Sequence, residues 1–328
     1  MISVLVPSYR IGGFGILADS LAAQTFRDFG LVIVDGIHAR RAHLVADRLA
    51  AYDFPIKHIA PSGGVYLSNY SRSINDGIAH AAGELIVIQT DYTWMPPDCL
   101  AEHWRAYQES DKKTCFLRDN HCTALPALHP EFRSYGPDME QFHEGWRAEI
   151  EQMINEGAER YAADLESGKL DPFMWSIFAE PLTQATVDAL TVTRSDVKQG
   201  RPGIDYRHAS LKNEGIPTEA FLAVNGLDED MDGSHLYQDQ EFACRVERAG
   251  YRWTTAPGAD VRIVNPRTVL SSKRLDRPMR GGGDSNEARM AVTLGGKQWA
   301  NPGRDLRAER AESLGPPVDP NEAGEGGE

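Results

Sequence analysis

Hydrophobic and polar positions alternate in short blocks of two kinds along the first hundred residues. Apolar runs of strand length are separated by stretches whose apolar residues recur at helical spacing. The strand-like runs are SVLVP (3–7), LVIVDG (31–36), IKHIA (56–60) and LIVIQT (85–90), and the helix-like stretches are GILADSLAAQT (15–25), HLVADRLAAY (43–52) and SNYSRSINDGIAHAAG (68–83). This alternation predicts βαβ crossovers and a mostly parallel sheet flanked by helices. Ligands bind such sheets beyond the carboxyl ends of the strands.

The pattern changes in the second half of the chain. Between residues 138 and 167 apolar residues recur at helical spacing among many charges, which predicts a helical insertion. We interpret it as packing on the core, with a lid or an oligomer contact as the alternative. The sequence then predicts a strand and turn at 220–230, a helix at 239–250 and a strand at 251–257. The last stretch, 301–328, is rich in Pro, Gly and Glu, which predicts a disordered, mobile C-terminal tail.

Composition narrows the class of protein. The chain has 328 residues, of which 41% are hydrophobic, as in an ordinary globular protein. No apolar run approaches the roughly 20 residues needed to cross a bilayer, so we expect a cytoplasmic protein without a membrane span. The formal net charge of −14 argues against wholesale binding to nucleic acid or anionic lipid. A basic stretch at 262–280 leaves open a local phosphate-binding face or a solvated loop.

Polar residues close the first two predicted strands. Pro7 and Tyr9 end the first strand and Asp35 ends the second, so all three lie at neighbouring carboxyl ends. A carboxylate there can accept a hydrogen bond from a base imide, and a tyrosine ring can stack on a base. A turn-forming role for Asp35 is the alternative. Further along, Arg72 and Asn75 lie in a predicted helix that suits a pyrophosphate or is an ordinary capped surface helix.

Taken together, the order of these motifs resembles that of the family 2 glycosyltransferases, inverting enzymes of GT-A fold. The motifs are SVLVPSYR (3–10), LVIVDG (31–36), NDGIAHAAGELIVIQTDY (75–92), NGLDED (225–230) and YQDQEFACRVERAGYRW (237–253). The resemblance covers about residues 2–110 and 215–258 and implies an α/β fold with a Rossmann-like central sheet. It further implies a nucleotide-sugar-binding half (1–110) and an acceptor-binding and catalytic half (111–260). After these we expect an extension that packs on the site (261–300) and the tail that composition predicts (301–328).

On the donor side, the resemblance implies that Asp35 holds the nucleotide base and that Pro7 and Tyr9 lie beside it. Asn75 matches the Arg-Asn-x-Gly run of the family, but Ile74 stands where arginine is expected, and Arg72 is a candidate substitute. These residues would face the ribose and diphosphate.

The acidic DxD element of the family is incomplete in this chain. A gap-free register puts Thr90 and Tyr92 at the two acidic positions, with Asp91 between them. A register shift of one residue would make Asp91 a ligand of Mn²⁺ or Mg²⁺, which needs hard oxygen ligands. Otherwise Asp91 would bind ribose or sugar hydroxyls, and cations such as Arg72, Lys273 and Arg274 would neutralise the leaving group.

On the acceptor side, Asp239 falls on the general-base position of the family, with Gln238 in place of the usual glutamate. An acceptor hydroxyl must lose its proton as it attacks, which one carboxylate can accept. A helix N-cap is the alternative role for Asp239. NGLDED resembles the loop that walls the acceptor pocket, which implies acceptor contacts for Gly226 and Asp228 or, for Asp228, a turn.

The resemblance therefore implies an enzyme that moves a sugar from a nucleoside diphosphate donor, with UDP favoured, to an acceptor hydroxyl with inversion. The acceptor is left open among glycan, protein, small molecule and nucleic acid, and so is the oligomeric state. A non-catalytic nucleotide-sugar-binding protein that has lost the metal element is the first alternative. Nucleotidyl transfer ranks last, because it leaves the helix at Asp239 without a role.

Overall fold

The computed structural model describes residues 1–8, 14–36, 38–62, 70–91, 93–118, 120–124, 191–196, 203–232, 237–255, 260–263 and 282–315, together with residues 163, 167 and 258. The predicted helical insertion at 138–167 lies outside the described residues except at 163 and 167. Tyr9, Tyr92, Lys273 and Arg274 lie outside them as well.

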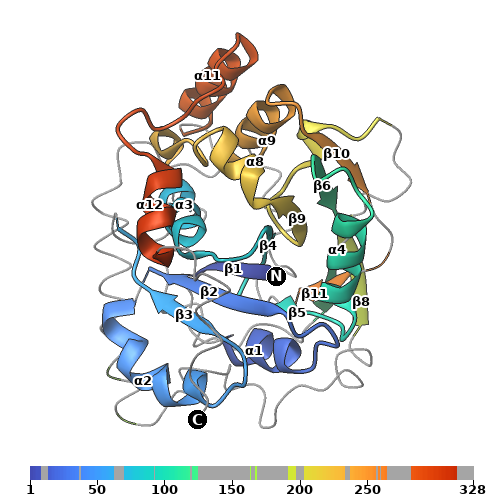
Figure 1. Ribbon diagram of the computed structural model, residues 1–328, viewed down its shortest axis with the longest axis vertical. Helices are drawn as coiled ribbons and strands as arrows, with labels where there is room; N and C mark the ends of the chain where they lie inside the picture. The colour runs from blue at the N-terminus through green and yellow to red at the C-terminus, as the bar shows by residue number, and fades with distance from the viewer. Residues whose placement is uncertain are drawn as a thin grey trace, which may run out of the picture.

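A seven-stranded sheet forms the centre of the described part (Figure 1). Its strands, in spatial order, are β10 (Arg252–Thr255), β6 (Thr114–Leu117), β9 (Glu214–Pro217), β4 (Leu85–Ile88), β1 (Ile2–Ser8), β2 (Phe29–Asp35) and β3 (Ile56–Ile59). The pairs of β1 with β2 and β4, and of β2 with β3, are parallel, whereas β9 runs antiparallel to β4 and β6. The predicted α/β fold with a mostly parallel sheet is confirmed.

A second, smaller sheet has four strands. They follow the order β5 (Thr93–Trp94), β11 (Val261–Ile263), β7 (Asn120–Ala124) and β8 (Thr191–Asp196). Strand β5 begins two residues after Asp91, so the chain passes from the central sheet to the small one at the incomplete acidic element.

Helices cover both faces of the central sheet (Figure 1). They are α1 (Phe14–Ala22), α2 (His38–Ala50), α3 (Tyr70–His80), α4 (Cys99–Gln108), α8 (Thr218–Ala223), α9 (Gln238–Arg248), α11 (Gly282–Leu294) and α12 (Leu306–Leu314), with short 3₁₀ turns η3 (Tyr206–His208) and η4 (Glu229–Met231). Along β1, Val4 and Val6 join the apolar cluster on the side of α1 and α2, and Leu5 joins the cluster on the side of α3. A strand buried on both faces reads as a continuous apolar run, as the sequence does here.

Two segments differ from the sequence-based prediction. Residues 220–223, the start of the predicted strand and turn at 220–230, lie in helix α8 instead, because β9 ends at Pro217 and already lies between β4 and β6. The helix then buries Phe221 in a stacked contact with Phe242 of α9, with ring centroids 4.7 Å apart.

Residues 301–315 are also not the expected tail. They hold α12, which packs against α3, with Leu306 buried at its first turn (Figure 1). Composition did not indicate this helix, since Leu306 is its one buried residue, whereas Arg307 pairs with Glu219 and Arg310 donates to the carbonyl of Ala81. Residues 316–328 lie outside the described residues.

Among the residues that the structure describes, no helix combines the length and the apolar character that a membrane crossing requires.

Candidate functional site

The carboxyl ends of β4, β1 and β2 bring together two of the predicted carboxylates. Asp35 is the last residue of β2 and Asp91 follows β4, and both are almost completely buried. Ser8, the last residue of β1, lies between them and donates a hydrogen bond from Oγ to Asp91 Oδ2 at 2.5 Å. The structure therefore places the two acids at the same edge of the sheet, as expected from parallel strands. Pro7 is buried within β1 next to them.

Asp35 is held by an arginine that the sequence analysis missed. Arg41 on α2 donates to both carboxylate oxygens, from Nε to Oδ2 and from Nη2 to Oδ1, each at 2.7 Å. His58 of β3 adds a contact of 2.9 Å to Oδ2. Burial alone would raise the pKa of Asp35, but the charge of Arg41 and the hydrogen bonds from His58 and Arg41 lower it to about 2. Asp35 is therefore ionised in the folded protein at any pH above about 3.

Arg41 also reaches the Asp91 side of the site. Its Nη2 donates to Ser8 Oγ at 3.1 Å, so hydrogen bonds run from Asp35 through Arg41 and Ser8 to Asp91. The guanidinium lies over the ring of Phe14 of α1, 4.2 Å from its centroid, and is fully buried. Planar guanidinium geometry allows these simultaneous contacts, which a lysine could not make.

The first turn of α3, predicted to face a pyrophosphate, is engaged by protein groups. The backbone N–H groups of Ser71 and Arg72 donate to the carboxylate of Asp232, at 2.6 and 3.1 Å. Burial raises the pKa of Asp232 to about 7. The Arg72 guanidinium pairs with Glu229 at 2.8 Å. An anionic ligand at this turn would therefore have to displace a carboxylate that already caps the helix.

Asn75 joins α3 to the loop that was predicted to wall the acceptor pocket. Its Oδ1 accepts from the backbone N–H of Leu227 at 2.8 Å, and its Nδ2 donates to the carbonyl of Leu227 and to Glu229 Oε1. Asn75, predicted on the donor side, thus bonds within the described chain to the neighbours of Gly226 and Asp228. The shared loop connects the predicted donor and acceptor residues.

Gly226 leaves no room for a side chain at this junction. Its φ of +75° lies in the left-handed region, and a Cβ there would come within 2.2 Å of Asn75 Oδ1. Gly226→Ala is therefore expected to destabilise the fold by about 1–3 kcal/mol, from backbone strain and a displaced buried amide. Urea unfolding would measure it. Gly203→Ala is the matched control, because Gly203 has a similar φ of +65° with open space around it, and an equal loss in both variants would contradict the packing argument.

Asp228 is already paired. It is almost completely buried, its side chain accepts from the backbone N–H of Asp230 to cap η4, and Lys297 donates to its Oδ2. Asp228 therefore has the turn-forming role and also a charge partner, Lys297. Lys297 comes from the stretch after α11 and could not be linked to Asp228 from sequence spacing.

The segment after α11 forms several hydrogen bonds with the loop that begins at Asn225. Asn225 donates from Nδ2 to the carbonyls of Ala300, Asn301 and Arg304. In return, Asn301 donates from its own Nδ2 to the carbonyls of Asn225 and Leu227. The two asparagines form a reciprocal lock across 76 positions of sequence.

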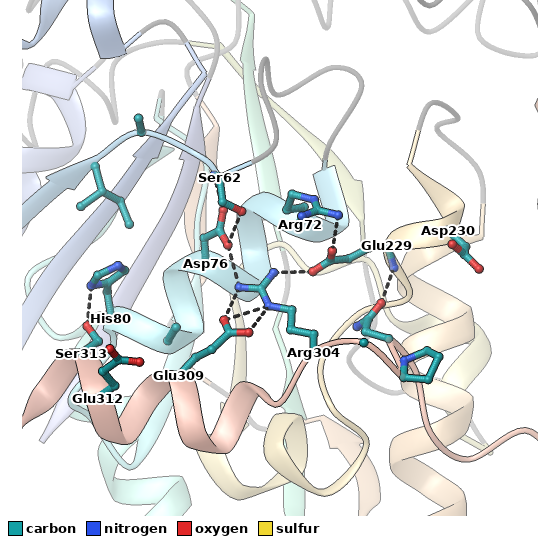
Figure 2. Close-up of a pocket in the computed structure, with 16 residues that line it drawn as sticks. Ser62, Arg72, Asp76, His80, Glu229, Asp230, Arg304, Glu309, Glu312 and Ser313 are labelled. Atoms are coloured by element: carbon teal, nitrogen blue, oxygen red, sulfur yellow. Dashed lines mark hydrogen bonds and ion pairs between the residues drawn. The ribbon is translucent and has the colours of Figure 1, made fainter.

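Arg304 is the centre of an ion cluster between α3, η4 and α12 (Figure 2). Its guanidinium donates to Asp76 at 2.7 Å, to Glu309 at 2.6–2.9 Å and to Glu229. An open cavity of about 860 Å³ borders this cluster; its lining includes Ser62, His80 and Ser313 besides the ion cluster. Arg72 is the one predicted site residue in that lining, so the cavity flanks the strand-end site rather than containing it.

Asp239 occupies the first turn of α9 but does not cap it. The residue at the N-cap is Tyr237, with φ of +70° and no side-chain cap bond, so the N-cap alternative for Asp239 is not realised. Gln238 beside it is buried and donates to the carbonyl of Met231. One turn further, Glu241 and Arg245 form a fully buried pair at 2.8 Å that anchors the helix. The side chain of Asp239 is partly exposed.

The described residues around Asp91 do not fit a divalent cation. No group of three or more His, Cys, Asp or Glu residues in the described part of the chain could hold a metal ion. Thr90 Oγ1 lies 2.7 Å from Thr93 Oγ1, so its hydroxyl is engaged within the turn. A hard cation takes several oxygen ligands, and Asp91 supplies only one carboxylate here.

Comparison with known proteins gives one family match. Residues 3–151 match the model of glycosyl transferase family 2. Among curated protein sequences, none matches this chain. Solved structures with a similar chain path include S. aureus TarS 1-349 alone and in complex with UDP, each 12% identical with a TM-score of 0.48 over 95% of this chain and 70% of that chain. The complex of S. aureus TarS 1-349 with UDP-GlcNAc is equally similar and is covered to 71%. Residues 3–151 of this chain are therefore similar to glycosyl transferase family 2.

Proposed function

We propose that the chain transfers a sugar, with inversion, from a UDP-linked donor to an acceptor hydroxyl. The observation that carries this proposal is the meeting of Asp35 and Asp91 at one edge of a parallel sheet, at the positions where the family holds its base and its acidic element. Asp35 receives the N–H of the base, and Asp91 receives hydroxyls of the ribose or sugar. Tyr9, one residue beyond the end of β1, is proposed to stack on the base.

Asp239 is proposed as the general base. The acceptor oxygen attacks the anomeric carbon as the bond from that carbon to the diphosphate oxygen breaks. The hydroxyl proton passes to the Asp239 carboxylate, and the nucleoside diphosphate leaves with the electron pair of the broken bond. Asp239 is suited to this step because it lies partly exposed on the first turn of a helix that the buried pair of Glu241 and Arg245 holds in place.

Calorimetric titration tests the donor site. We expect UDP to bind wild-type protein more tightly than GDP or dTDP, and Asp35→Ala to weaken UDP binding by about 10- to 100-fold, the loss of one or two hydrogen bonds to a charged group. Each titration is run with Mn²⁺ and with EDTA. Unchanged affinity in Asp35→Ala would reject the role of Asp35.

A non-catalytic nucleotide-sugar-binding protein is the second candidate, favoured by the poor fit of the described residues to a metal ion. UDP-sugar binding without turnover, in the presence of a broad set of acceptors, would select this candidate. Release of UDP from the bound donor would exclude it.

A further inference from the structure

Arg41 lies outside every motif that carries the family resemblance, yet its side chain bonds to groups at the ends of two neighbouring strands. It is among the largest fully buried side chains of the described residues. Three of its hydrogen bonds go to groups at the ends of neighbouring strands, two to Asp35 and one to Ser8. Ser8 passes the connection on to Asp91. The spatial order Asp91, Ser8, Asp35 follows the strand order β4, β1, β2.

The two buried carboxylates at this edge of the sheet favour a buried cation beside them. Asp35 and Asp91 are buried at the ends of β2 and β4, which are separated only by β1. An unpaired buried carboxylate is strongly unfavourable. Arg41 supplies a cation that reaches the first directly and the second through a hydroxyl. Because its guanidinium is planar, its contacts set the angle of the Asp35 carboxylate as well as its charge.

Packing of α2 does not by itself explain Arg41. Val45 and Leu49 of the same helix are buried in the apolar cluster and hold the helix against the sheet. Arg41 instead places its charge beyond the strand ends, at the position where ligands bind in folds of this type.

We propose that Arg41 is a positioning residue for the donor. It fixes the position of the Asp35 carboxylate directly and that of the Asp91 carboxylate through Ser8. The base and the sugar-diphosphate end of the donor are thereby held at a fixed position relative to each other. This inference rests on the proposed function. In this role Arg41 does not contact the donor itself and acts through the two carboxylates.

Arg41→Lys tests the proposal. Lysine keeps the charge but cannot make the two-point contact with Asp35 and reach Ser8 as well. We expect UDP affinity to fall by about 10- to 100-fold, as for the loss of a hydrogen bond to a charged group. Arg48→Lys, an exposed position on the same helix, is the matched control and should bind as wild type does.

The dependence of UDP affinity on pH distinguishes a positioning role of Arg41 from a role in fold stability alone. In wild type, Asp35 stays ionised from pH 5 to 8, so its own protonation should contribute no change in UDP affinity over this range. With lysine in place of Arg41, burial outweighs the remaining attraction and the pKa of Asp35 rises, so UDP affinity should acquire a new dependence on pH. A variant that is merely less stable would bind UDP with the wild-type profile once folded.

The link to Asp91 is tested with a double-mutant cycle. We expect Ser8→Ala and Asp91→Asn to be non-additive in their effects on affinity for the UDP-sugar that titration selects, since both break the same connection. Additive effects, or an Arg41→Lys variant that binds UDP normally, would overturn the positioning role alone. No UDP binding by wild type would overturn the proposed function and this inference together.

Discussion

Asp239→Asn is expected to lower sugar transfer by about 10²- to 10⁴-fold while leaving UDP-sugar affinity within about twofold of wild type. The amide is close in shape to the carboxylate but cannot accept the acceptor proton. The first turn of α9 should survive the change, because Tyr237 rather than Asp239 occupies the N-cap and the buried pair of Glu241 and Arg245 is untouched. Turnover is measured as UDP release from the donor that titration selects, with each acceptor that supports activity.

Glu247→Gln is the matched control for this prediction, since it makes the same chemical change at an exposed position of the same helix. Its turnover should equal that of wild type. If Asp239→Asn loses donor binding in parallel with turnover, or keeps full turnover, Asp239 is not the base.

Arg304→Met is expected to destabilise the protein by about 3–5 kcal/mol, the range found when one partner of a buried ion pair is removed. Arg304 is 13% exposed and is bonded to Asp76, Glu229 and Glu309, so its removal leaves carboxylates close together without their cation. Thermal unfolding should show a midpoint lowered by about 6–20 °C for a protein of this size.

Arg307→Met, on the same helix, provides the comparison. Its pair with Glu219 is exposed on both sides, and such pairs are worth about 0–1 kcal/mol. The double variant Arg304→Met, Glu309→Gln should recover part of the loss by removing one of the stranded charges. Equal midpoints for Arg304→Met and Arg307→Met would show that the cluster does not hold α12 in place.

Most of the central sheet could be predicted from the sequence, because strands buried on both faces produce unbroken apolar runs such as Val4–Val6 and Leu85–Ile88. The sequence placed Asp35 and Asp91 at the ends of two predicted strands, but the strand order β4, β1, β2 that brings them to either side of Ser8 came from the structure. Helix α8 could not be predicted in the same way, since its apolar residues equally suit a strand and only the occupied edges of β9 decide against one.

The hydrogen-bond and ion-pair partners of the predicted residues could not be predicted from the sequence for a different reason. Arg41 meets Ser8 across 33 positions, and Lys297 meets Asp228 across 69. No local periodicity records such contacts. Asn75 shows the limit most clearly: the family motif identified the position, but its side chain bonds to Leu227 and Glu229, which the motif does not mention.

The reciprocal lock between Asn225 and Asn301 has a consequence for how the chain reaches its native state. Contacts that join distant positions form late, because the loop between them must close before they contribute. During synthesis, the loop at Asn225–Glu229 can take its final shape only after the residues that follow α11 have left the ribosome. We therefore expect the N-terminal βαβ units to assemble first and the loop at Asn225–Glu229 to reach its native conformation last, as one of the final events of folding.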